Sequence, residues 1–174
     1  MKKAFLILED GTVFQGTSIG SQREVISEIV FNTSMTGYLE VLTDPSYAGQ
    51  AVTMTYPLIG NYGICRDDME SERPWPDGFI VRELSRLPSN FRSTETIQNF
   101  LSQYDIPGIA GIDTRALTKI LREKGTMNGM ITTEEYTDLS DIIPRLKAYT
   151  TGKVVEKVTC REKYVLEGDG PRVA

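Results

Sequence analysis

The chain has 174 residues, 40% of them apolar, which is enough for the hydrophobic core of one domain of ordinary size. It contains no histidine, which excludes histidine-based acid–base catalysis, histidine zinc ligation and a phosphohistidine carrier. A formal net charge of -5 and a pI near 4.9 argue against a nucleic-acid partner, since phosphate binding requires clustered Lys and Arg.

The first residues of the chain and its two cysteines are typical of an intracellular protein. The apolar run after Met1 is ended by Glu9 and Asp10, far short of a signal peptide, and no stretch is long enough to span a membrane. Cys65 and Cys160 are too few and too far apart for a disulfide framework, so intracellular free thiols are the simpler interpretation. We therefore expect a cytoplasmic protein with no membrane partner.

Strand signals dominate the first half of the chain. Residues 4–8 and 12–14 flank Asp10-Gly11, a dipeptide suited to a tight hairpin because both positions tolerate positive φ. Other short apolar runs are closed by Gly, Pro, Asn or Asp. They predict strands at 28–31, 39–42, 51–54 and 79–81.

The second half alternates helix and strand signals. The predicted helices start at polar caps and carry apolar residues three and four apart. Their starts are expected at Ser93 or Thr94, at Asp113 and near Ser140, and Gly125 ends the second. Pro107 stops the first helix, and Pro144 is tolerated only in the first turn of the third. Short strands are predicted at 109–112 and 127–131.

This order of elements predicts an α+β domain over residues 1–150, with sheet layers covered by helices, rather than an open doubly wound fold. After Thr150 the pattern dissolves into a polar, charge-mixed stretch that contains Gly168-Asp169-Gly170-Pro171. Such a composition is typical of a linker. We expect residues 151–174 to lead toward a domain that is absent from this sequence.

The stretch from Phe31 to Gly63 concentrates small hydroxyls, amides, glycines and tyrosines. Ser46 lies in Asp44-Pro45-Ser46-Tyr47, where Asp-Pro-Ser is typical turn chemistry. A nucleophilic Ser46 would need a base, and only Asp44 is near in sequence. A turn residue and a ligand-binding hydroxyl remain as its interpretations, and the two can coexist.

Three further features have an ordinary interpretation beside a functional one. Cys65 follows Gly63-Ile64 but is followed by Arg66-Asp67, without the glycine of a nucleophile elbow, so an ordinary thiol is favoured. The acidic residues from Asp67 to Glu72 lack the spacing of a calcium loop, which favours a solvated loop over a metal site. Trp75, between two prolines, is expected at the rim of the core or at an interface.

Several motifs in order resemble one family. They are Phe31-Asn32-Thr33-Ser34-Met35-Thr36-Gly37-Tyr38, the Ser46 turn, Ser89-Asn90-Phe91-Arg92, Gly111-Ile112-Asp113-Thr114-Arg115 and Leu121-Arg122-Glu123-Lys124-Gly125. Together they resemble the amino-terminal domain of the small, glutamine-dependent amidotransferase subunit of carbamoyl-phosphate synthase, over about residues 8–131. In that family a glutaminase domain with a cysteine nucleophile follows this one, and the present sequence stops where it should begin.

The resemblance implies a fold, partners and a role. The implied fold is the three-layer β/β/α type of swivelling phosphotransfer domains, although the phosphorylatable histidine is absent. The implied partners are the large subunit, the glutaminase domain and glutamine, which Ser46 would help to bind. The resemblance implies no catalytic residue, metal or cofactor in this chain, because ATP and Mg are used in the large subunit. The product, carbamoyl phosphate, serves arginine and pyrimidine synthesis.

Two other functions stay open from the residues alone. A free-standing small-molecule-binding or regulatory module would also need no catalytic residues. An independent hydrolase that uses Ser46 or Cys65 would require a base that the sequence does not supply. The family interpretation is favoured, because the linker-like stretch after Thr150 is unexpected in a self-contained module.

Overall fold

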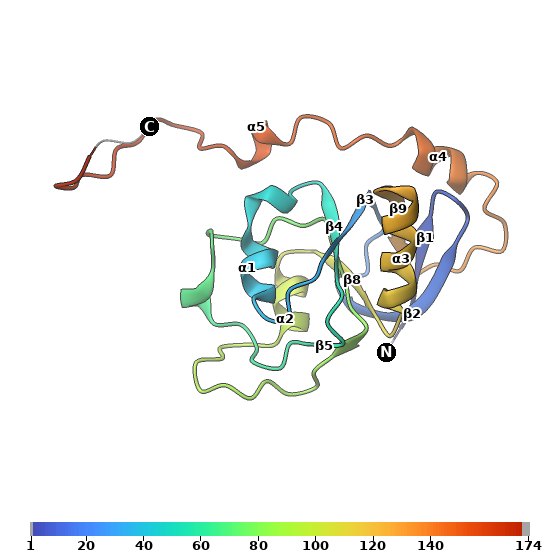
Figure 1. Cartoon of the computed structure of the whole chain (residues 1–174), viewed down its shortest axis with the longest axis horizontal. Helices are drawn as coiled ribbons and strands as arrows, with labels where there is room; N and C mark the ends of the chain where they lie inside the picture. Colours follow the sequence, from blue (N-terminus) through green and yellow to red (C-terminus); the bar gives the residue numbers. More distant parts are fainter. Residues whose placement is uncertain (1, 172–174) are drawn as a thin grey trace.

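Seven strands close into a barrel in the computed structural model, which describes residues 2–171 (Figure 1). The strand order around the barrel is β1-β2-β8-β6-β4-β3-β9. The barrel strands are β1 (Lys3–Leu8), β2 (Val13–Gly20), β3 (Val25–Asn32), β4 (Gln50–Met54), β6 (Gly78–Ile80), β8 (Pro107–Ala110) and β9 (Met127–Thr132). A separate two-stranded sheet pairs β5 (Leu58–Ile59) with β7 (Glu83–Leu84).

Helices cover this barrel and connect its strands. They are α1 (Tyr38–Thr43), α2 (Ile97–Gln103), α3 (Thr114–Lys124), α4 (Ile142–Ala148) and α5 (Val155–Val158), with short 3-10 turns η1 (Pro45–Tyr47) and η2 (Arg66–Asp68). The α+β class is confirmed. The three-layer swivelling arrangement is not confirmed, because the described strands close into a barrel instead of separating into two sheet layers.

Four neighbouring barrel strands run parallel. The pairs β3–β4, β4–β6 and β6–β8 are all parallel, whereas β1 and β9 pair antiparallel with their neighbours. The carboxyl ends of β3, β4, β6 and β8 therefore lie at one edge of the barrel. The chain leaves β8 at this edge and enters α3.

Alternating side chains divide the core. One face of the strands contributes the barrel interior, with Leu6, Ile29, Ala51, Ile80 and Ile131 among its buried residues. Helix α3 packs Leu117 and Leu121 onto this interior cluster. The outer face is covered by α1 and α2 on one side, through residues such as Leu42 and Phe100, and by α4 on the side of β1 and β9.

Most predicted elements are confirmed, with shifted bounds. The hairpin β1–β2 forms, but only Gly11 of the Asp10-Gly11 turn has a positive φ (87°). The Asp10 carboxylate instead accepts a hydrogen bond from the Thr12 amide at 2.9 Å. Strand β2 continues well beyond the predicted residues 12–14 because both of its edges are paired, to β1 and to β8.

The strand predicted at 39–42 is wrong, because these residues lie in helix α1. Leu39 and Leu42, three positions apart, both reach the outer core, and Gly37 starts the helix with a φ of 83° that suits glycine. The predicted cap of α2 is also wrong. Thr96 caps it by accepting a hydrogen bond from the Asn99 amide, while Thr94 donates to the Ile64 carbonyl.

The segment after α4 runs along the upper edge of the molecule, as an extended chain with the single turn α5 (Figure 1). Most of its described side chains are exposed. Thr151 and Val154 nevertheless pack so closely over Gly49 that no side chain would fit there without a shift. The division into a domain at 1–150 and a linker at 151–174 stays a prediction.

None of the helices within residues 2–171 combines the length and apolarity that crossing a bilayer requires.

Candidate functional site

The turn that carries Ser46 is fixed by hydrogen bonds from its own backbone. The Asp44 carboxylate accepts from the Ser46 amide at 2.8 Å, and the Ala48 amide donates to the Pro45 carbonyl at 3.1 Å. Ser46 itself is exposed, and its hydroxyl makes no hydrogen bond with residues 2–171. The turn interpretation of Ser46 is therefore correct, and its hydroxyl is left available. Its role in binding glutamine stays a prediction.

A small hollow of about 330 Å³ lies beside this turn. Its lining includes Pro45 and Tyr47, the two neighbours of Ser46, and the carboxylates of Glu40, Asp44 and Glu70. One oxygen of Glu40, Oε2, is buried without a hydrogen-bond partner in the described part of the chain. Carboxylates in a concave site favour a ligand with a positively charged or hydrogen-bond-donating group.

Two tyrosines in the stretch from Phe31 to Gly63 are structural. Tyr38 is buried, stacks on Tyr62 with 4.1 Å between ring centroids, and donates a hydrogen bond to the Gly63 carbonyl. The Tyr62 hydroxyl accepts from the amides of Gly37 and Tyr38 at the start of α1. Burial raises the pKa of Tyr38 far above its usual range, so both rings act as neutral packing groups.

Cys65 is a buried thiol. Its Sγ donates a long hydrogen bond to the Tyr62 carbonyl and accepts one from Asn90 Nδ2 at 3.3 Å. Burial raises the pKa of Cys65, although Arg92 opposes this effect. A protonated, buried thiol is a poor nucleophile, which agrees with an ordinary structural cysteine.

The acidic residues from Asp67 to Glu72, and Trp75 after them, make contacts within this domain. Asp68 makes a bidentate ion pair with Arg92, at 2.9 and 3.0 Å. No cluster of three potential metal ligands occurs in residues 2–171.

Trp75 is partly buried and donates a hydrogen bond to the Ser71 hydroxyl at 2.7 Å. The Arg73 guanidinium lies 4.0 Å from the centroid of its ring. These contacts suit a residue at the rim of the core.

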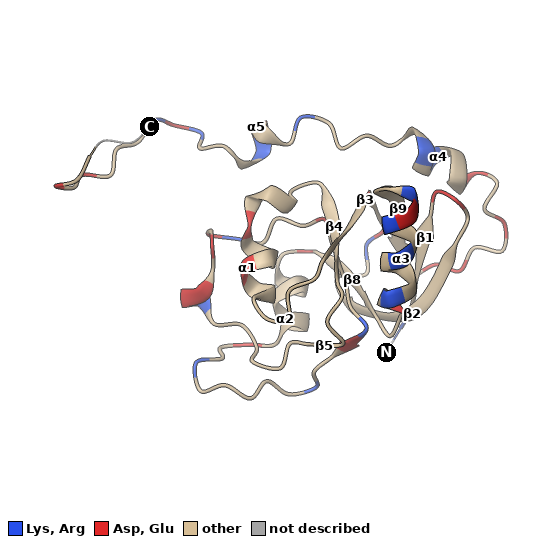
Figure 2. Ribbon diagram, viewed as in Figure 1, with Lys and Arg blue, Asp and Glu red and all other residues tan. Residues whose placement is uncertain are grey.

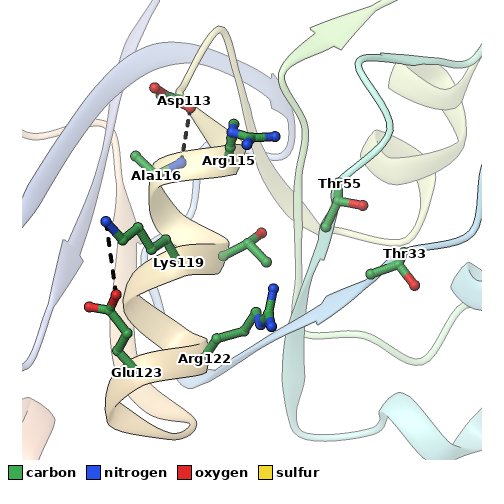
Figure 3. Close-up of a pocket in the computed structure, with 9 residues that line it drawn as sticks. Thr33, Thr55, Asp113, Arg115, Ala116, Lys119, Arg122 and Glu123 are labelled. Carbon is green, nitrogen blue, oxygen red and sulfur yellow. Dashed lines mark hydrogen bonds and ion pairs between the residues drawn. The ribbon is translucent and has the colours of Figure 1, made fainter.

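A larger groove, of about 850 Å³, lies between α3 and the ends of β3 and β4 (Figure 3). Its helical wall includes Arg115, Thr118, Lys119 and Arg122, and its opposite wall includes Thr33 and Thr55. Figure 2 shows basic residues gathered on α3. This groove was not predicted from the sequence, although basic residues at i, i+4 and i+7 of a predicted helix are a usable signal.

One known family model matches most of the chain, and known proteins match almost all of it. The family model "Carbamoyl-phosphate synthase small chain, CPSase domain" matches residues 6–131. The chain belongs to this family. The carbamoyl phosphate synthase small chain of Clostridium perfringens is 53% identical to it over 172 residues, which are 99% of this chain and 49% of that protein. The expected family resemblance is thus confirmed.

Other small-chain relatives match with similar identity and coverage. The small chain of Oceanobacillus iheyensis is 53% identical over 99% of this chain and 47% of its own length. The pyrimidine-specific small chain of Halalkalibacterium halodurans is 51% identical over 98% and 47%, respectively. The chain therefore spans about half the length of the curated relatives that it matches. The motifs around Ser46, the Tyr38 helix and α3 all lie within the matched family region.

Proposed function

We propose that this chain is the amino-terminal domain of the small subunit of a glutamine-hydrolysing carbamoyl-phosphate synthase. In the proposed enzyme, a glutaminase domain releases ammonia from glutamine, and the large subunit uses it with ATP, Mg and bicarbonate to make carbamoyl phosphate. We expect the enzyme to work in the cytoplasm, for arginine or pyrimidine synthesis. The match to the small-chain family over residues 6–131 supports this proposal most strongly.

In the proposed enzyme, this domain would contact the other parts of the enzyme rather than catalyse a reaction. It would dock on the large subunit and pack against the glutaminase domain. Two observations are consistent with a domain that has no catalytic residue of its own: the chain contains no histidine, and Cys65 is buried with a raised pKa. The cysteine nucleophile and its base would belong to the glutaminase domain.

An exposed apolar surface supports the docking role. Phe91 is 98% exposed and Leu87 is 80% exposed, in the loop that follows β7. This loop runs beside the segment of β5, because the Ser89 amide donates to the Asn61 carbonyl at 2.8 Å. Leu58 of β5 is also exposed. Large apolar side chains that remain in water cost free energy, which association with a partner would recover.

The Ser46 turn supports the contact with glutamine. The hydrogen-bonded turn presents an exposed hydroxyl that makes no hydrogen bond with residues 2–171. The carboxylates of Glu40, Asp44 and Glu70 line the hollow beside the turn, without Ser46 itself, and would attract the α-ammonium group of an amino acid. We therefore propose that this side of the domain faces the glutaminase domain.

A binding experiment with the purified large subunit tests the docking role. We expect the chain to bind that subunit at micromolar concentration in isothermal titration calorimetry. Phe91→Ala should weaken this binding about tenfold or more, because buried aromatic anchors dominate protein interfaces. Tyr164→Ala, which truncates an exposed aromatic residue in the segment after α4, is the matched control and should bind normally. Absence of binding by the unmodified chain at micromolar concentration would refute the docking role.

A further inference from the structure

The groove beside α3 has a cationic wall. Arg115, Lys119 and Arg122 occupy positions i, i+4 and i+7 of the helix, so all three lie on one face. At 1.5 Å per residue they extend over about 10 Å of the helix axis. In Figure 3 the side chains of Arg115 and Arg122 extend toward the strand ends.

The two arginines are not neutralised by their neighbours. The side chains of Arg115 and Arg122 make no hydrogen bond and no ion pair within residues 2–171, and both residues are exposed. Both carboxylates of the groove interact with other groups of helix α3. Asp113 accepts from the Ala116 amide at 3.0 Å and so caps the helix, and Glu123 lies 3.9 Å from Lys119. The lining therefore carries three cationic side chains against two carboxylates, and Arg115 and Arg122 are the cations that form no ion pair within residues 2–171.

The opposite wall supplies hydroxyl groups at the carboxyl ends of two parallel strands. Asn32 of β3 pairs with Met54 of β4, so the next residues, Thr33 and Thr55, are neighbours. Both line the groove. Crevices outside the carboxyl ends of parallel strands are the usual ligand sites of α/β sheets. Two residues before Thr55, the buried Thr53 hydroxyl has no partner in the described part of the chain, but Thr53 does not itself line the groove.

We infer that this groove binds a small, phosphate-bearing anion. Its volume of about 850 Å³ lies in the usual range for small-molecule sites, and its lining contains no large apolar side chain. The guanidinium group matches phosphate through paired hydrogen bonds, and threonine hydroxyls supply further donors. Because Asp113 occupies the start of α3, the anion binds to the arginines rather than to the helix terminus. This site is independent of the proposed docking and glutamine-binding roles.

Titration of the chain with inorganic pyrophosphate tests the site. We expect saturable binding in calorimetry, with NMR shifts concentrated on the amides of Thr33, Thr55 and Arg115. Arg122→Gln should weaken binding about tenfold or more, since a hydrogen-bonded ion pair with the anion is lost. Arg115→Gln should act in the same direction. Arg86→Gln, which removes an exposed arginine in the loop after β7, is the matched control and should bind normally.

The outcomes separate a specific site from general charge attraction. Absence of saturable pyrophosphate binding would overturn the inference, as would equal weakening by Arg86→Gln. A partner surface on the large subunit is the competing explanation of the cationic wall. If Arg115→Gln and Arg122→Gln leave pyrophosphate binding unchanged but weaken binding to the large subunit, the groove is a protein contact and the inference is wrong. Unfolding curves of the variants show whether each remains folded.

Discussion

Tyr62 has a structural role at the start of helix α1. Its hydroxyl accepts hydrogen bonds from the Gly37 amide at 2.7 Å and the Tyr38 amide at 3.2 Å. Amides in the first turn of a helix have no partner within that helix, and Gly37 has no side chain that could cap them. A residue distant in sequence thus replaces the usual capping side chain and fixes α1 immediately before the Ser46 turn.

Ser46 is the residue for which we predict an effect on substrate binding. A neutral hydrogen bond to the substrate contributes about 0.5–1.5 kcal/mol, so Ser46→Ala in the complete small subunit should raise the KM for glutamine roughly two- to twelve-fold. Ammonia-dependent carbamoyl phosphate synthesis should be nearly unchanged, because it bypasses glutamine binding. Both activities are measured in the enzyme reassembled with its large subunit.

Cys65→Ser serves as the comparison for this experiment, because Cys65 lies two residues after the stretch from Phe31 to Gly63 but is buried. It should leave the KM for glutamine unchanged. Unaltered glutamine kinetics in Ser46→Ala would reduce Ser46 to a turn residue. Loss of both activities would mean that the substitution had damaged the fold or a subunit contact.

An ion pair joins two elements that are far apart in sequence, the β1–β2 hairpin and helix α3. Lys124 Nζ, in the last turn of α3, lies 2.7 Å from Asp10 Oδ2 in the hairpin turn. Burial by itself raises the pKa of Asp10, but the hydrogen bonds from Lys124 and Thr12 outweigh it and lower the pKa below its usual value of 3.8. The Asp10 carboxylate therefore stabilises the folded state only while it is ionised.

We predict that Asp10→Asn lowers the free energy of unfolding at neutral pH by about 0.5–1 kcal/mol, because the ion pair is partly exposed. A depressed pKa in the folded state contributes stability above the usual pKa, and this stability is lost as the pH falls through the folded-state value. The difference between variant and unmodified chain should thus disappear at a pH well below 3.8. Urea unfolding curves of the variant and the unmodified chain, at neutral pH and at a pH well below 3.8, measure this difference in the free energy of unfolding.

Asp67→Asn is the matched control for this prediction. Asp67 is exposed and forms no ion pair with residues 2–171, so the same chemical change should leave stability within error at both pH values. A pH-independent loss of stability in Asp10→Asn would instead attribute the effect to the turn hydrogen bond with Thr12.

The chain as a whole contains no histidine, and Cys65 is buried. We predict that the purified chain releases no glutamate from glutamine above the rate without protein. Its only buried thiol within residues 2–171 has a raised pKa, and no histidine is present to activate a nucleophile. A coupled glutamate assay measures this. Release that Cys65→Ser abolishes would contradict the prediction.

Much of the local structure was determined by the sequence itself. Helix α3 begins after Asp113 and ends before Gly125, as predicted. Helix capping and chain reversal depend on residues only a few positions apart, so they can be recognised in the sequence. The same holds for the Ser46 turn, in which Asp44 binds the amide two residues later. Family membership was also evident from the sequence, because it rests on ordered motifs rather than on their arrangement in space.

Only the tertiary structure decided how these pieces combine. Residues 39–42 were predicted as a strand, since a four-residue apolar run does not distinguish strand from helix, and packing against the outer core settles it. The barrel order, with β1 beside β9, depends on pairing between distant strands. The α3 groove likewise needs Arg122 opposite Thr33 and Thr55, which only long-range strand pairing and the packing of α3 on the interior core bring together.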